Sequence, residues 1–295
     1  MAGKGKFPPA KEKARSPGRQ AWQRLRRNRM AVAALVFLGG MVLACMAGPW
    51  LLAHDGVTQD RVLGPVHPSA AHWLGTDILG RDLLVRILEG GRVSLQVGLI
   101  GTLVSLLIGV GYGLVAGYAG GRTDRVMMRL VDSLYALPFT LFVILMTVVF
   151  GQSLGLIYVA IGAVSWLTMA RIVRNQVLTL KTQPFVEAAV CLGQRPGKIM
   201  TRHLLPNLLG TVIVYATLTV PGVMLVEAFI SFLGLGVKAP MTSWGLLIKE
   251  GADVMEEFPW LLIFPSGFFS LTLFALNFLG DGLRDALDPR AGKEI

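Results

Sequence analysis

Residues whose types and spacing could do chemistry are few in this sequence. The histidines and cysteines are scattered and show no metal-ligand spacing: His54, His67, His72, His203, Cys45 and Cys191. Gly197-Lys198 is followed by Ile199 and lacks the upstream glycine of a phosphate-binding loop. The stretch from Gly111 to Ala116 formally matches a dinucleotide fingerprint, but no strand is expected before it. We therefore expect no metal site, no cofactor on this chain and no enzymatic activity.

The composition of the segments that hold these residues is that of a membrane protein. Of the 295 residues, 53% are hydrophobic and 16% are charged, and the mean hydropathy is +0.60. A soluble domain carries about 25% charged residues. The composition excludes a disordered chain, a disulfide-stapled secreted domain and an ordinary cytosolic enzyme. The net charge of +10 does not indicate nucleic-acid binding, because ten of the 28 Lys and Arg residues lie in residues 1–30, directly before an apolar run.

Six segments are long and apolar enough to cross a membrane, which takes about 20 residues. The first covers residues 31–53. Residues 133–170 carry no charge and are too long for one span, so the glycine-containing stretch at 151–155 is expected to divide them. The expected spans after the first cover residues 93–121, 133–150, 154–171, 204–226 and 259–280. The predicted fold class is an all-α polytopic membrane protein with six transmembrane helices.

The distribution of Lys and Arg predicts the orientation of the chain. With the N-terminus in the cytoplasm, the cytoplasmic segments hold 22 basic residues and the outside segments hold 6. Both termini, including the basic tail 1–30 and the tail 282–295, are therefore expected in the cytoplasm. The first span is expected to be an uncleaved helix, because its 23 apolar residues exceed the core of a normal signal peptide.

The outside segment, residues 54–90, contains an amphipathic pattern from Asp77 to Glu89. Apolar residues share one face, and charged residues fall mainly on the other: Arg81, Asp82, Arg86 and Glu89. Gly90-Gly91 supplies a stop signal. The pattern predicts an interfacial helix at the outer membrane surface, with Trp73 as an anchor.

The spans themselves predict close packing and little ionic chemistry. Gly109, Gly113 and Gly117 repeat at a four-residue spacing in the second span, which lets two helices approach closely. Within the spans Glu227, near an end, is the main ionisable residue, so no buried proton relay is evident. If the protein moves a solute uphill, its energy source is expected on another chain.

The loop at 172–206 is too long for a helical hairpin and is expected to contain short helices. Gln183-Pro184 is typical of a helix start, and Gly193 of a helix end. Pro196 can begin a second helix, and Pro206 opens the fifth span. Exposed apolar residues on such a cytoplasmic elbow indicate a partner surface. Packing against its own chain remains an equal alternative on these grounds.

Two motifs in this loop resemble the EAA loop of ABC-importer permeases. Three residues separate Glu187-Ala188-Ala189 from Gly193, and nine residues separate Gly193 from His203-Leu204-Leu205-Pro206. Histidine at the start of the last motif, within Arg202–Asn207, resembles the dipeptide, oligopeptide and nickel branch of the family. Further segments agree, at residues 22–29, 72–82, 231–236, 243–245 and 280–290. The resemblance covers nearly the whole chain and is to the second, C-type permease of such systems.

The resemblance implies a type I ABC-importer transmembrane domain at residues 91–281, with the first span as an additional helix. It implies a homologous permease as heterodimer partner, two cytoplasmic ATPases that bind ATP and Mg²⁺, and an extracytoplasmic substrate-binding protein, in the lipid bilayer of the bacterial cytoplasmic membrane. The loop would be a coupling helix on an ATPase, with these positions: Glu187, Ala188, Ala189, Gly193, His203 and Pro206. Glu227 and Trp244 lie in the outer part of the chain, where a gate or a contact with the binding protein is one interpretation and simple packing is the alternative.

The implied activity is ATP-driven uptake of short peptides by alternating access. Nickel, glutathione or another small peptide-like solute remains open within the same branch. A secondary transporter or channel that works without ATPases is the second hypothesis. It differs in predicting that changes at Glu187 and Gly193 are tolerated.

Overall fold

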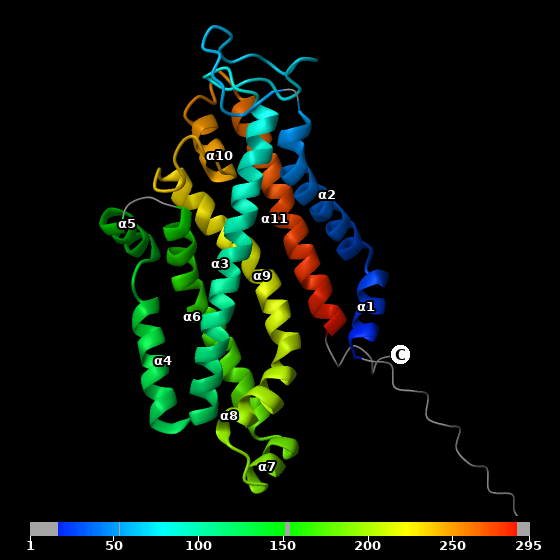
Figure 1. Cartoon of the computed structure of the whole chain (residues 1–295), viewed down its shortest axis with the longest axis vertical. Coiled ribbons are helices and arrows are strands. Elements are labelled where there is room, and N and C mark those ends of the chain that lie inside the picture. The colour runs from blue at the N-terminus through cyan, green and yellow to red at the C-terminus, as the bar shows by residue number, and fades with distance from the viewer. Residues whose placement is uncertain (1–16, 53, 151–153, 288–295) are drawn as a thin grey trace, which may run out of the picture.

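The structure is a computed structural model that describes residues 17–52, 54–150 and 154–287, and within these ranges every named element is a helix. Long helices run side by side along the long axis of the molecule (Figure 1). The chain begins with α1 (Pro17–Arg27) and α2 (Arg29–Leu51). Helix α2 packs against α11 (Trp260–Leu287), where Ala34, Leu38 and Ala275 form a small apolar cluster. The expected first span is therefore a helix on the outside of the bundle.

Helix α3 (Leu83–Ala119) packs along α6 (Leu154–Lys181) through the glycines at four-residue spacing. A Cβ atom placed on Gly113 would lie 2.5 Å from the carbonyl oxygen of Ala170. Gly109 and Gly117 face Met169 and Val177 of α6 at similarly short distances. The predicted close approach is confirmed, because only a hydrogen atom fits between the two backbones at these positions.

The predicted helix stop at Gly90-Gly91 is wrong, because α3 continues through both residues without a break. A Cβ atom on Gly91 would lie 2.7 Å from the Trp244 ring, and one on Gly90 would lie 3.1 Å from the backbone of Ser243. The two glycines therefore allow a neighbouring segment to pack closely rather than ending the helix. Of the separate interfacial helix expected over 77–89, residues 83–89 are the first part of this long helix, and residues 77–82 form a turn before it.

The third segment also differs from its predicted bounds. Helix α4 (Gly121–Tyr135) extends through the expected start at residue 133, and α5 (Phe139–Phe150) begins after Pro138. Proline disfavours helical geometry at the residue before it, which explains the break at this point. The predicted division near 151–155 falls between α5 and α6, at residues 151–153, which lie outside the described residues.

The second half of the chain begins with a group of short helices. These are α7 (Pro184–Cys191), α8 (Pro196–Ile199) and the π-helix η1 (Met200–Leu204). Helix α9 (Leu205–Phe232) continues past Glu227, as expected, and α10 (Trp244–Ala252) precedes α11. Four helical runs in the described residues are long and apolar enough to cross a membrane: 29–51, 83–119, 196–232 and 260–287. Helix α6, at 28 residues, is about 42 Å long.

Two regions lie at opposite ends of the long axis (Figure 1). We call residues 184–206, with α7, α8 and η1, the elbow. We call residues 54–94 and 227–252 the cap, which includes α10 and the ends of α3 and α9 that meet it. The beginning of α1 and the end of α11 lie toward the elbow end (Figure 1).

Candidate functional site

Helix α7 of the elbow begins and ends where its sequence predicts. Pro184 occupies the first turn, where its missing N–H costs nothing. Gly193 has φ +69° and donates its N–H to the carbonyl of Val190 at 2.9 Å. The N–H of Gln194 reaches back to the carbonyl of Ala189 at 3.1 Å. This pair of bonds is a Schellman motif, and it needs a residue that accepts positive φ, which is the reason for glycine at 193.

The two faces of α7 have different environments. Val186 and Ala189 are buried in an apolar cluster with residues of α6, η1 and α9. Glu187 and Ala188 are exposed on the other face. Three exposed apolar side chains accompany them on α7 and just after it: Phe185, Val190 and Leu192. One face of α7 therefore fixes the elbow to its own chain, and the other is open to a partner.

The elbow is closed by a side-chain contact between its two halves. His203 of η1 makes a hydrogen bond between Nε2 and Oε1 of Gln194, with the two atoms 3.0 Å apart. Gln194 directly follows the glycine that ends α7. The bond therefore fixes the orientation of α7 relative to the helical run that contains η1. Pro206 is exposed in the first turn of α9 and does not interrupt that run, which extends from Pro196 to Phe232.

All six predicted coupling residues lie in the elbow, and the structure corrects the expectation for one of them. Glu187, Ala188, Gly193 and His203 lie on or beside the open face or fix its geometry. Ala189 is 3% exposed and packs against its own chain, so it does not offer a close approach to another protein. The two alternatives for the elbow, a partner surface and self-packing, therefore apply to opposite faces of one helix.

The other two predicted residues lie at the opposite end, inside the cap. Glu227 is 1% exposed and accepts hydrogen bonds from Ser231 at 2.7 Å and from Ser94 at 3.1 Å. Trp244 is fully buried, and its ring N–H donates to the carbonyl of Ile87 at 2.9 Å. Neither side chain reaches the surface in this structure, so a direct contact with a binding protein does not fit it. A gating role stays a prediction.

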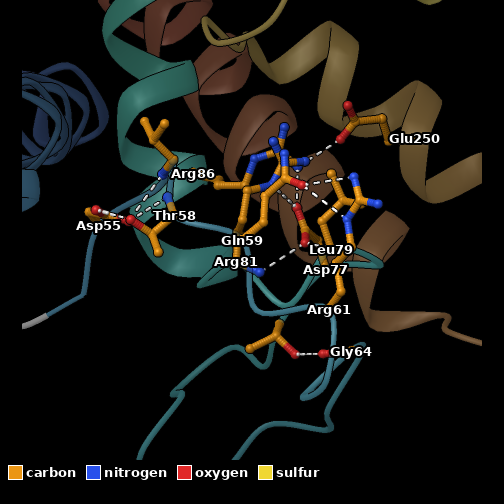
Figure 2. Close-up of polar contacts among 12 residues, drawn as sticks. Asp55, Thr58, Gln59, Arg61, Gly64, Asp77, Leu79, Arg81, Arg86 and Glu250 are labelled. Carbon is orange, nitrogen blue, oxygen red and sulfur yellow. Dashed lines mark hydrogen bonds and ion pairs between the residues drawn. The ribbon is translucent and has the colours of Figure 1, made fainter.

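Sequence reasoning missed an ion-pair network in the cap. Arg86 lies between Asp77 and Glu250 and donates to both at 2.7 Å (Figure 2). Arg81 donates to the same carboxylate of Asp77, also at 2.7 Å. Asp77 and Arg86 are each 3% exposed, although the amphipathic pattern predicts their region on a polar surface. This charged face is covered by two elements, the segment that precedes α3 and the helix α10. The buried Asp77 and Arg86 therefore each have a partner of opposite sign.

The segment between α2 and α3 is ordered by short local hydrogen bonds. The Thr58 hydroxyl and backbone N–H each donate to the Asp55 carboxylate at 2.7 Å (Figure 2). These bonds stabilise the charged form and hold the pKa of Asp55 below its usual value. The hydroxyl of Thr76 donates to the carbonyl of Gly64 at 2.7 Å, which fixes the far part of the same segment. The cap is therefore built from defined turns.

Two family models match the sequence. Residues 109–293 match the model described as binding-protein-dependent transport system inner membrane component. Residues 16–65 match the N-terminal transmembrane domain of oligopeptide transport permease C. The first match includes the elbow and covers more than half of the chain, and the second includes α1 and α2.

Characterised relatives match almost the full chain. The oligopeptide transport system permease protein OppC of Escherichia coli K12 is 50% identical over 285 residues, which are 95% of this chain and 94% of that protein. The dipeptide transport system permease protein DppC of Bacillus subtilis 168 is 47% identical, over 92% of this chain and 85% of its own length. The glutathione transport system permease protein GsiD of Pectobacterium atrosepticum is 39% identical, over 94% and 92%.

The fold is also that of a solved transporter. An inward-facing structure of the MetNI methionine ABC transporter matches with a TM-score of 0.59 at 20% identity, over 70% of this chain and 96% of the matched chain. This likeness shows the type I ABC-importer permease fold. The family matches and the relatives indicate the same family of transport proteins, and the elbow is consistent with it. The chain belongs to the family of binding-protein-dependent transport system inner membrane components, the permease subunits of ABC importers.

Proposed function

We propose that this permease subunit takes part in the ATP-driven import of short peptides across the bacterial cytoplasmic membrane. Relatives named for oligopeptide or dipeptide transport are 37–50% identical to this chain, and five of them are 47–50% identical. The glutathione permease is 39% identical, so the highest identities favour peptides over glutathione. Nickel, the other alternative from the sequence, has no support of this kind among the relatives described above.

The open face of α7 is the observation that carries the coupling role. Glu187 and Ala188 lie on a helix held by the Gly193 turn and the His203–Gln194 bond. An ATPase groove that binds this face would therefore contact a helix whose orientation relative to the rest of the chain is fixed. The elbow joins α6 at Lys181 and continues into the helical run from Pro196 to Phe232. Movement of an ATPase would tilt these long helices directly. The tilt would convert an inward-open pathway into an outward-open one.

The proposed assembly contains a homologous permease, two cytoplasmic ATPases that bind ATP and Mg²⁺, and an extracytoplasmic binding protein. We place six transmembrane helices in this chain, with α4 and α5 together making the third. The 22 basic residues in the expected cytoplasmic segments favour an orientation with both termini and the elbow in the cytoplasm. The cap then faces the binding protein, and the ATP-hydrolysing residues lie on other chains.

One experiment compares co-purification and uptake for the wild type and three variants in the native membrane. Glu187→Lys reverses the charge on the open face, and Gly193→Pro forces φ to about −65° where the turn needs a positive value. Gly197→Ala is the matched control in the same elbow, because a Cβ atom there meets nothing within 4 Å. Labelled dipeptides and tripeptides measure uptake, and mass spectrometry identifies the proteins that accompany each variant.

The wild type and Gly197→Ala are expected to retain a second permease and Walker-motif ATPases and to take up peptide. Both elbow variants are expected to insert normally, lose the ATPases and lose uptake. Recovery of the wild-type chain alone, with uptake that persists in both elbow variants, would favour a secondary transporter. Normal assembly with uptake of nickel or glutathione instead of peptide would change the substrate and leave the coupling role intact.

A further inference from the structure

Three potential metal ligands meet in the cap although they are distant in the sequence. His54 follows α2, His72 lies in the segment before α3, and Asp82 is the N-cap residue of α3. One ligand atom from each lies within 4.8 Å of the other two. The spacings of 18 and 10 residues match no metal motif, which is why the sequence predicted no metal site. The fold itself brings these residues together.

The carboxylate of Asp82 is held in position by the helix it begins. One of its oxygens accepts the backbone N–H of Val85 at 3.1 Å, and the other lies 2.9 Å from Nδ1 of His72. Asp82 is 6% exposed, and the His72 side chain is 14% exposed. Two of the three ligands are therefore largely buried and fixed before any ion arrives, which lowers the conformational cost of binding.

The third ligand closes the group from the solvent side. The imidazole rings of His54 and His72 have centroids 4.6 Å apart and are inclined at 48°. Ligand atoms around a tetrahedral Zn²⁺ lie about 3.3 Å from one another, since each Zn–ligand distance is about 2 Å. The ligand atoms of the group already lie within 4.8 Å of one another, and the exposed side chain of His54 has room to rotate toward the shorter spacing.

A cavity gives an ion access to the group. It has a volume of about 330 Å³ and is lined in part by His54, Asp82, Trp73 and Leu84. This volume is large enough for a hydrated ion and for water as a fourth ligand. Two imidazoles and one carboxylate with an open position suit Zn²⁺ and its neighbours among divalent transition metals, and disfavour Mg²⁺ and Ca²⁺, which prefer oxygen alone.

We propose that His54, His72 and Asp82 bind one divalent transition-metal ion, for which Zn²⁺ serves as the probe. The ion would connect two residues of the segment that follows α2, His54 and His72, to Asp82 at the start of α3. It would thereby fasten the outermost part of the cap to the long helix that runs to the other end of the molecule. This inference rests on the residues of this chain and holds whether or not the transported solute is a peptide.

The test measures Zn²⁺ affinity of the full-length detergent-solubilised chain with the subunits that accompany it. The chain carries a tag without histidine and is stripped of metal before titration against a chromophoric zinc chelator. The variant is His54→Ala, which changes an exposed side chain and leaves the folded core intact. The matched control is His67→Ala, because His67 lies in the same segment, stacks on Trp260 and is outside the three-residue group.

The wild type and His67→Ala are expected to bind one equivalent of Zn²⁺ per chain, and His54→Ala to bind at least about tenfold more weakly. Zn²⁺ is also expected to raise the unfolding temperature of the wild type and the control but not of His54→Ala. Absence of saturable binding would overturn the proposal, as would equal affinity in His54→Ala and the wild type. An equal loss in both variants would indicate general binding to surface histidines and would also overturn it.

Discussion

The cap and the elbow differ in how many polar side chains they bury. Fourteen polar or charged residues are buried in the described part of the chain, and ten of them lie in the cap. None lies in the elbow, which is described throughout. Both regions expose apolar side chains, but those of the elbow, with Leu192 at 78% and Val190 at 54%, accompany no buried polar residue. The cap is thus held together by polar bonds within this chain, whereas the elbow has an apolar open face and no such network.

This difference indicates where each region gets its stability. Buried ions and hydroxyls are costly unless they are paired, so the cap depends on bonds made within this chain. Exposed apolar area next to a rigid helix gains free energy only when a second protein covers it. We therefore expect substitutions in the cap to change the stability of the isolated chain, and substitutions in the elbow to change its association.

The largest effect on stability is expected for Arg86→Ala in the cap. The change leaves Asp77 with Arg81 as its remaining cation and frees Glu250. Breaking a buried ion pair by removing one partner costs on the order of 3 kcal/mol. Thermal unfolding in detergent and abundance in the membrane measure the loss. Arg61→Ala is the control, since Arg61 is exposed and bonds only to nearby Gln59 in the contacts given by the structure.

If Arg86→Ala and Arg61→Ala unfold at the same temperature as the wild type, the polar network does not hold the cap together. The contrast with the elbow would then rest on burial alone.

A pair of glycine substitutions compares packing at the two ends. A Cβ atom on Gly245 of α10 would lie 2.5 Å from Cα of Ala228, so Gly245→Ala forces α10 away from α9. Such overpacking costs about 1–3 kcal/mol. Gly197→Ala in the elbow meets no atom within 4 Å and is expected to be neutral or slightly stabilising. Denaturant or thermal unfolding of both variants checks this, and equal effects would contradict the contrast.

A smaller effect is expected for the bond that closes the elbow. His203→Ala removes the hydrogen bond to Gln194, which is worth about 1 kcal/mol. A double-mutant cycle with Gln194→Ala isolates this contact, because each single change removes the same bond. The free energy of unfolding is measured for the wild type, both single variants and the double variant. A coupling energy near zero would show that the Schellman turn at Gly193 fixes the elbow without help from His203.

The smallest effect on stability is expected for Leu192→Ser in the elbow. Its side chain is 78% exposed, so the free energy of unfolding should change by less than about 0.5 kcal/mol. Association with the ATPases should nevertheless weaken, because an apolar contact is lost from the interface. Titration of ATPase binding to the purified permease measures this. A large loss of stability without a loss of binding would reverse the roles given to the two regions.

Much of the fold could be predicted because hydropathy and glycine spacing are properties of the local sequence. The glycines from Gly109 to Gly117 predicted close helix packing, and α3 meets α6 there. Pro184 and Gly193 predicted the ends of α7, since helix caps need particular backbone angles. The stop predicted at Gly90-Gly91 failed, because the same residue type serves both helix ends and close contacts.

The candidate sites could be predicted only in part. The EAA-like motif placed Glu187, Ala188, Gly193 and His203 in one loop, but it did not show that Ala189 faces inward. Arg86 belonged to a charged face whose partners lie far away in the sequence, and Glu250 is 164 residues later. An amphipathic pattern shows which side of a helix is polar. It does not show whether water or another part of the protein covers that side.

By itself, the sequence determined that this chain is a helical membrane protein of the ABC-importer permease family, because composition, apolar run length and motif order need no distant contacts. Only the tertiary structure decided that the elbow has one inward and one open face, that Glu227 and Trp244 are buried, and that His54, His72 and Asp82 meet. These features depend on segments that are distant in the chain and adjacent in space, so no local pattern encodes them.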